Sequence, residues 1–216
     1  MRPEIPLQPR RDAVVSHAIH PALVFIMEAF LSSTFAVAIA EIGDKTQLLA
    51  LFLAARYGRP YIISLGVLIA TLVNHALSAW LGAVLADVIP AEWIKWIVGG
   101  SFIAIGLWLL IPDKEDDEMG RFANYGPFVA TLVLFFLAEI GDKTQIATVI
   151  LAAKFSADMW MTMAVIAGTT FGMLLANVPV IFAGKWLMDK LPLGIAHKAA
   201  CVLFIGLGVA TLVGMS

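Results

Sequence analysis

The strongest constraint on the fold is an eight-residue motif, rich in charged and polar side chains, that occurs twice inside long apolar runs. Ala-Glu-Ile-Gly-Asp-Lys-Thr-Gln stands at 40–47 and again at 138–145. The two halves also resemble each other further along, where Asp87–Pro90 corresponds to Asp189–Pro192. Matching stretches in the same order at two places indicate a duplicated unit. We therefore expect the chain to consist of two copies of one structural half.

The apolar runs are long enough to cross a lipid bilayer. The chain is 61% hydrophobic and 14% charged, with a mean hydropathy of +0.91, well above the apolar share of a soluble domain. A transmembrane helix needs about 20 mainly apolar residues. The sequence thus predicts an all-α membrane protein with six transmembrane helices, at about 29–55, 61–88, 93–111, 126–153, 160–187 and 193–213.

An odd number of spans in each half determines how the halves relate. The second copy must enter the membrane from the opposite side, which gives two inverted three-helix repeats, the plan of many secondary transporters. The predicted division is an N-terminal extension at 1–26, a first three-helix repeat at 27–111, an acidic linker at 112–125 and a second three-helix repeat at 126–216.

Basic residues outside the spans favour one side of the membrane. Seven lie on one side and five on the other, and the cytoplasmic side usually carries the excess. We therefore expect a multi-pass protein of the inner (plasma) membrane with both termini outside the cytoplasm. The larger set is Arg56, Arg59, Lys114, Arg121, Lys185, Lys190 and Lys198, and the smaller is Arg2, Arg10, Arg11, Lys95 and Lys154.

Charge and cysteine content exclude several classes of function. The net charge is −2 and no basic block resembles a nucleic-acid footprint, so we expect no nucleic acid among the partners. Cys201 is the single cysteine, which leaves no intrachain disulfide and no thiolate cluster for a metal cofactor. The expected partners are membrane lipid and a transported ion, with homo-oligomerisation left open and no bound cofactor.

Each motif places two carboxylates and a lysine near the middle of a span. A charge at the centre of a bilayer costs about 2.5 to 3.5 kcal/mol, so six unpaired charges would cost on the order of 15 to 20 kcal/mol. These side chains must therefore face the protein interior and have partners. They are Glu41, Asp44 and Lys45 in the first copy and Glu139, Asp142 and Lys143 in the second.

Helical periodicity predicts how each motif is presented. In a continuous α-helix, Glu41, Asp44 and Gln47 form one polar stripe, and Lys45 lies one turn after Glu41, where the two can pair. The second stripe contains Glu139, Asp142 and Gln145. Glycine within each motif, at 43 and 141, leaves room for close helix approach or for local unwinding. Inverted symmetry then brings both stripes into one pocket, and these six residues, including Gln47 and Gln145, are the predicted metal ligands.

The predicted pocket suits a divalent cation. Four carboxylates and two ammonium groups carry −2 when all are ionised, which balances one such ion. Carboxylate and amide oxygens favour hard ions such as Ca²⁺, Mn²⁺ or Mg²⁺, whereas zinc and copper usually recruit Cys or His. Crowded carboxylates in a low dielectric also take up protons, which favours cation/proton exchange. Asn74, His75 and Asn177 either border this pocket or only pack the helices.

With these motifs, the chain resembles a family of small cation/proton antiporters in the LysE superfamily, which includes bacterial manganese exporters and the Golgi and chloroplast calcium/manganese transporters. The family signature is a duplicated Glu-x-Gly-Asp-Lys/Arg-Thr/Ser in the first and fourth of six helices, and the likeness runs from about Met27 to the end. The resemblance implies that Glu41, Asp44, Glu139 and Asp142 coordinate the ion. It also implies a supporting role for Thr46, Gln47, Thr144 and Gln145.

The expected function is export of Mn²⁺, or of Ca²⁺, in exchange for protons, without enzymatic activity. Two other classes compete with it. An intramembrane aspartyl protease would use Asp44 and Asp142, but such a dyad shares one proton, and here each Asp is accompanied by a Glu and a Lys. In the remaining class the charged residues only hold helices together, as single intramembrane pairs often do, and two symmetric copies disfavour this.

Overall fold

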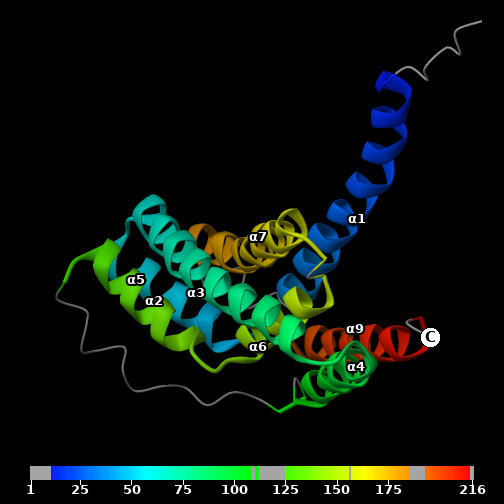
Figure 1. Cartoon of the computed structure of the whole chain (residues 1–216). Coiled ribbons are helices and arrows are strands. Elements are labelled where there is room, and N and C mark those ends of the chain that lie inside the picture. Colours follow the sequence, from blue (N-terminus) through cyan, green and yellow to red (C-terminus); the bar gives the residue numbers. More distant parts are fainter. Residues whose placement is uncertain (1–10, 109, 112–124, 156, 185–192, 215–216) are drawn as a thin grey trace, which may run out of the picture.

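A computed structural model of the chain describes residues 11–108, 110–111, 125–155, 157–184 and 193–214. All regular secondary structure in these residues is helical (Figure 1). The helices are α1 (Arg11–Ala40), α2 (Lys45–Tyr57), α3 (Pro60–Val88), α4 (Ala91–Trp108), α5 (Pro127–Glu139), α6 (Lys143–Lys154), α7 (Met159–Ala183) and α9 (Leu193–Gly214).

Within the described residues, three helices are long and apolar enough to cross a membrane: the Ala22–Ala40 part of α1, all of α3 and all of α7. Shorter apolar helices occupy Pro127–Glu139 and Lys198–Val213. Together these helices make the chain a multi-pass membrane protein. The predicted extension at 1–26 overlaps α1, which begins at Arg11, and residues 112–124 of the predicted linker lie outside the described part of the chain.

The prediction of one continuous helix through each motif is wrong. The run at 29–55 is divided into α1 and α2, and the run at 126–153 is divided into α5 and α6. The cause is local: Gly43 and Gly141 adopt φ angles of 85° and 73°, in the left-handed region that interrupts a right-handed helix. The unwinding that these glycines permit therefore occurs in both copies, at the position of the charged residues.

The helices of the two halves pack crosswise. The long helix α1 of the first half lies along α7 of the second, and α5 of the second half lies along α3 of the first (Figure 1). In the same way α2 contacts α7, and α6 contacts α3. The remaining large contacts pair α3 with α7 and α4 with α9. Each half therefore packs mainly on the other.

Two equivalent glycines show this correspondence at atomic detail. A Cβ on Gly66 of α3 would lie 2.7 Å from Thr131 Cβ and 3.3 Å from the Phe128 carbonyl oxygen of α5. A Cβ on Gly168 of α7 would lie 3.0 Å from Ser33 Cβ and 2.4 Å from the Phe30 carbonyl oxygen of α1. Phe30 and Phe128 each stand eleven residues before the glutamate of their motif. The same close helix approach is thus built twice.

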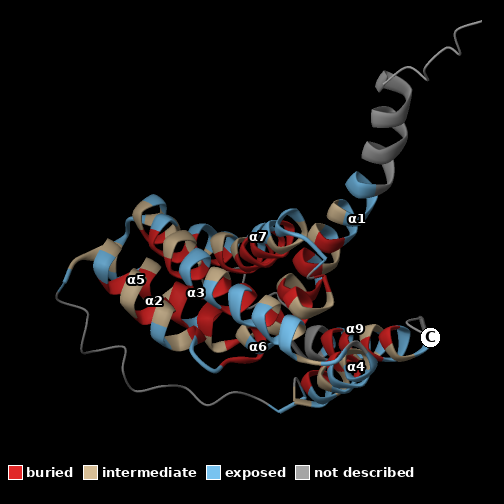
Figure 2. Cartoon of the chain, in the orientation of Figure 1, coloured by how far each residue is buried: buried red, intermediate tan, exposed pale blue. Residues whose placement is uncertain are grey.

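Buried residues are distributed along the packed helices (Figure 2). Among the described residues, the buried apolar side chains form two clusters. One contains residues of α1, α3, α4, α6, α7 and α9, among them Phe102 and Phe204, whose ring centroids lie 6.0 Å apart in an edge-to-face arrangement. The other contains residues of α2, α3, α5 and α7, among them Leu53 and Phe135. Each cluster thus includes residues of both halves of the chain.

Candidate functional site

Each motif forms the same backbone break between two helices. In the first, Asp44 N–H donates to Glu41 O at 3.1 Å, and in the second Asp142 N–H donates to Glu139 O at 3.1 Å. Each aspartate then occupies the extended residue before a helix, at the N-terminus of α2 or α6. Helix N-termini carry partial positive charge, so a carboxylate at this position stabilises the new helix.

The glycine of each break has a measurable energetic role. Gly43 has a φ of 85°, and a left-handed conformation costs a residue with a Cβ about 1 to 2 kcal/mol. We expect Gly43→Ala to lower the thermal unfolding temperature of the detergent-solubilised protein. Gly100→Ala is the matched control, because Gly100 is helical and nothing lies within 4 Å of a Cβ added to it. Equal unfolding temperatures for both variants would contradict this prediction.

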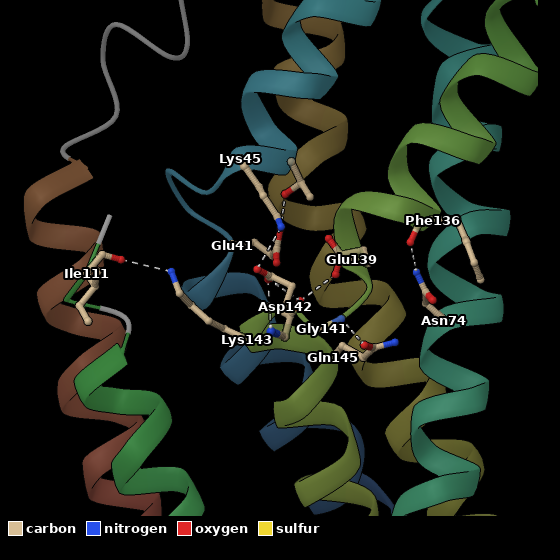
Figure 3. A network of polar contacts seen from close by, with 12 residues as sticks. Glu41, Lys45, Asn74, Ile111, Phe136, Glu139, Gly141, Asp142, Lys143 and Gln145 are labelled. Atoms are coloured by element: carbon tan, nitrogen blue, oxygen red, sulfur yellow. Dashed lines mark hydrogen bonds and ion pairs between the residues drawn. The ribbon is translucent and has the colours of Figure 1, made fainter. Parts of the chain in front are cut away.

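Three carboxylates from the two motifs lie together. One oxygen from each of Glu41, Glu139 and Asp142 falls within 4.8 Å of the others, and all three residues are buried (Figure 3). The first glutamate comes from the end of α1 and the second from the end of α5. The separate motifs thus meet at one acidic cluster in the protein interior.

A motif threonine holds each glutamate of this cluster. Thr46 Oγ1 donates to Glu41 Oε2, and Thr144 Oγ1 donates to Glu139 Oε2 at 2.8 Å. The second oxygen of each carboxylate, Oε1 in both cases, is buried and has no hydrogen-bond partner in the part of the chain that the structure describes. A buried oxygen without a donor is costly, so this arrangement favours a ligand that supplies positive charge.

Asp44 lies beside the cluster, not among its three closest carboxylates. Its side chain is buried, and its backbone N–H donates to the carbonyl oxygen of Glu41 at 3.1 Å. Of the four predicted carboxylate ligands, the structure therefore brings three into immediate proximity and places the fourth next to them.

The two motif glutamines contact the backbone of the breaks. Gln47 Oε1 accepts from Gly43 N–H at 2.8 Å, and Gln145 Oε1 accepts from Gly141 N–H at 2.6 Å. Gln47 Nε2 also donates to the Ala176 carbonyl of α7 at 2.9 Å. These contacts stabilise the unwound segments, and the Gln47 amide connects one of them to α7.

The two motif lysines make different contacts. Lys45 Nζ lies 3.5 Å from Asp142 Oδ1 of the other motif, an ion pair that the expected pairing of Lys45 with Glu41 did not include. The helical break removes the one-turn spacing on which that expectation depended. Lys143 Nζ donates to the Ile111 carbonyl at 3.4 Å and lies 5.9 Å from the Trp108 ring centroid.

The polar residues of α3 and α7 are buried close to the breaks. Asn74 Nδ2 donates to the Phe136 carbonyl at 3.1 Å, three residues before Glu139. Asn177 follows Ala176, the acceptor of Gln47, and its own amide donates to Met173 O at 3.1 Å. The side chain of His75 is fully buried, and neither ring nitrogen has a hydrogen-bond partner.

Four buried hydroxyl groups without a hydrogen-bond partner among the described residues were not predicted from the sequence. They belong to Ser33, Ser64, Thr71 and Thr170. The position of Thr71, one turn before His75 in an apolar span, could have indicated one of them. With His75 and Asn177 Oδ1, these groups are buried polar atoms of α1, α3 and α7.

Comparison with known proteins identifies a family that this chain matches. The chain matches the family model "Divalent cation/proton antiporter GDT1" over residues 29–117 and 127–216. It is 51% identical to a Vibrio cholerae protein named "Putative manganese exporter" over 187 residues, 86% of this chain and 91% of that protein. It is 27% identical to GDT1-like protein 5 of Arabidopsis thaliana over 225 residues, 87% of this chain and 96% of that protein. No solved structure matches the chain.

Proposed function

Because this chain belongs to the GDT1 family of divalent cation/proton antiporters, we propose that it exports Mn²⁺ in exchange for protons through the acidic cluster shared by its two motifs. Members of this family are transporters and not enzymes. The matched regions cover both halves of the chain, including both copies of the motif.

The observation that carries the proposal is the meeting of Glu41, Glu139 and Asp142 within 4.8 Å. Three carboxylates so close in a buried position repel each other strongly unless a cation lies among them. The two glutamates are oriented by Thr46 and Thr144, and each keeps one oxygen without a donor. Such oxygens supply the ligands that hard divalent ions prefer.

We propose Mn²⁺ as the main substrate, with Ca²⁺ as the second candidate. The donor set is built from oxygen, which both ions accept. The name of the Vibrio cholerae relative favours manganese. In the proposed site Glu41, Glu139 and Asp142 bind the ion directly, Asp44 adds negative charge beside it, and Gln47 and Gln145 maintain the breaks. Asn74 and Asn177 support the surrounding helices.

Proton exchange follows from the same charges. When the cation leaves, repulsion among the carboxylates is relieved if protons bind in its place. Arrival of the next cation then expels these protons. One site can thus carry either a divalent ion or protons, but not both, which is the requirement for antiport.

We propose that two inverted three-helix repeats, with boundaries at 27–111 and 126–216, form this transporter. The crosswise packing of α1 on α7 and of α5 on α3 supports equivalent halves, as does the matching approach of Gly66 and Gly168. In this arrangement α1 with α2, and α5 with α6, each act as one interrupted span. We place the protein in the inner membrane with both termini outside the cytoplasm.

The protease alternative is not favoured by the geometry. Asp142 forms an ion pair with Lys45, and Asp44 does not belong to the closest group of carboxylates. A catalytic dyad instead requires two aspartates that share one proton.

We expect purified protein in sealed vesicles to accumulate Mn²⁺ when the vesicle interior is more acidic than the medium, and Mn²⁺ addition to release protons from the lumen. Mn²⁺ and Ca²⁺ are tested separately with an ion-sensitive dye and a pH dye, and protein-free vesicles serve as the control. Mn²⁺ uptake that is unaffected by collapse of the pH gradient would argue against antiport.

A further inference from the structure

The motif lysines have the same place in the sequence of each half but different contacts, and this difference indicates a role for one of them. We propose that the ammonium group of Lys45 is an internal cation that occupies the acidic cluster in the empty state and must be displaced when a divalent ion binds. This inference rests on the proposed function, because it concerns the same site.

The position of the ammonium group supports competition with the ion. Lys45 Nζ lies 3.5 Å from Asp142 Oδ1, and Asp142 is one of the three clustered carboxylates. This ammonium group thus partly neutralises one of the three carboxylates that would hold the ion. A divalent ion on the same carboxylates would be repelled by that ammonium group at short range.

The exposure of the two partners shows which of them can move. The side chain of Lys45 is 22% exposed, whereas that of Asp142 is 4% exposed. Lys45 also begins α2, directly after the unwound segment of the first motif. A long, flexible side chain at the edge of the cluster can withdraw without disturbing the carboxylates, which stay fixed in the interior.

The equivalent residue of the second motif provides a comparison within the same molecule. Lys143 is buried, and its ammonium group contacts the Ile111 carbonyl and the face of Trp108 near the end of α4. These contacts stabilise the position of α4. We therefore assign the competing role to Lys45, whose ammonium group forms an ion pair with a carboxylate of the acidic cluster.

This role has a consequence for transport. An empty acidic cluster retains a positive charge from Lys45, which reduces the repulsion that would otherwise follow ion release. The same charge weakens ion binding at equilibrium and hastens release. Lys45 is therefore a residue that sets affinity, and it does so without being a ligand.

The test compares Lys45→Met with Lys143→Met by equilibrium Mn²⁺ binding to detergent-solubilised protein at alkaline pH, where protons compete least. We expect Lys45→Met to bind Mn²⁺ about tenfold more tightly than the unmodified chain, equivalent to about 1.4 kcal/mol. Lys143→Met is expected to raise affinity less than Lys45→Met, because the Lys143 ammonium group donates to the Ile111 carbonyl and lies by the Trp108 ring. Unchanged or weaker binding by Lys45→Met would overturn the inference.

A second measurement uses the unmodified protein and so does not depend on folding of a variant. Bound Mn²⁺ is expected to increase the rate at which a water-soluble, amine-reactive reagent modifies Lys45. The rate of modification at Lys143 should stay unchanged. Peptide mass spectrometry measures both rates. A Lys45 rate that does not respond to bound Mn²⁺ would also overturn the inference. If the unmodified chain binds no Mn²⁺ at all, the proposed function itself fails, which is a distinct result.

Discussion

Asp142→Asn is expected to reduce Mn²⁺ flux about 100-fold, since removal of one charge from a buried, paired site costs about 3 kcal/mol. Asp142 is both a member of the three-carboxylate cluster and the ion-pair partner of Lys45. Asn has nearly the same shape, so the loss would reflect charge and not packing. Initial rates of Mn²⁺ uptake into vesicles, normalised to the amount of inserted protein, measure the effect.

The control for this variant is the same substitution at an exposed aspartate. Asp87 lies near the end of α3 and is exposed to the surroundings of the protein. Asp87→Asn should therefore retain the flux of the unmodified chain. Comparable flux in Asp142→Asn and Asp87→Asn would show that the acidic cluster does not bind the transported ion.

Gly168→Ala is expected to lower stability by about 1 to 3 kcal/mol through overpacking. The added Cβ would lie 2.4 Å from the Phe30 carbonyl oxygen, which belongs to the backbone and cannot rotate away. The helices α1 and α7 would have to separate, and α1 carries Glu41 into the acidic cluster. Flux should therefore fall along with the thermal unfolding temperature.

Gly206→Ala is the matched control for this loss. Gly206 is exposed on α9, and nothing lies within 4 Å of a Cβ added there. Because Ala favours a helix over Gly by about 1 kcal/mol, this variant should unfold at the same temperature as the unmodified chain or slightly higher. If Gly168→Ala behaves in the same way, the close approach of α1 and α7 is not important for stability.

The class of fold was predictable because membrane solvation acts on whole segments. The apolar runs at 61–88 and 160–187 predicted α3 and α7 closely, since length and hydropathy are sufficient for a span. Local unwinding of the helix at Gly43 and Gly141 was one of two possibilities that the sequence left open. Glycine permits both a close helix contact and a positive φ, and the choice between them depends on tertiary partners such as Gln47 and Ala176.

The residues of the candidate site were predictable for a different reason. Charges inside a span must be buried together, so Glu41, Glu139 and Asp142 could be assigned to one pocket from their positions alone. Their individual partners could not be assigned, because pairing depends on the path of the backbone. Lys45 illustrates this point: helical spacing directed it to Glu41, whereas the unwound segment brings it to Asp142.

The crosswise packing of α1 on α7 and of α5 on α3 also limits what one half of the chain can do alone. Separated from its counterpart, either half would expose small-residue surfaces such as Gly66 or Gly168, together with an isolated glutamate from the interrupted helix. A half-length ancestor with this packing would have been an obligate dimer. Gene fusion would then have preserved an existing interface within a single polypeptide.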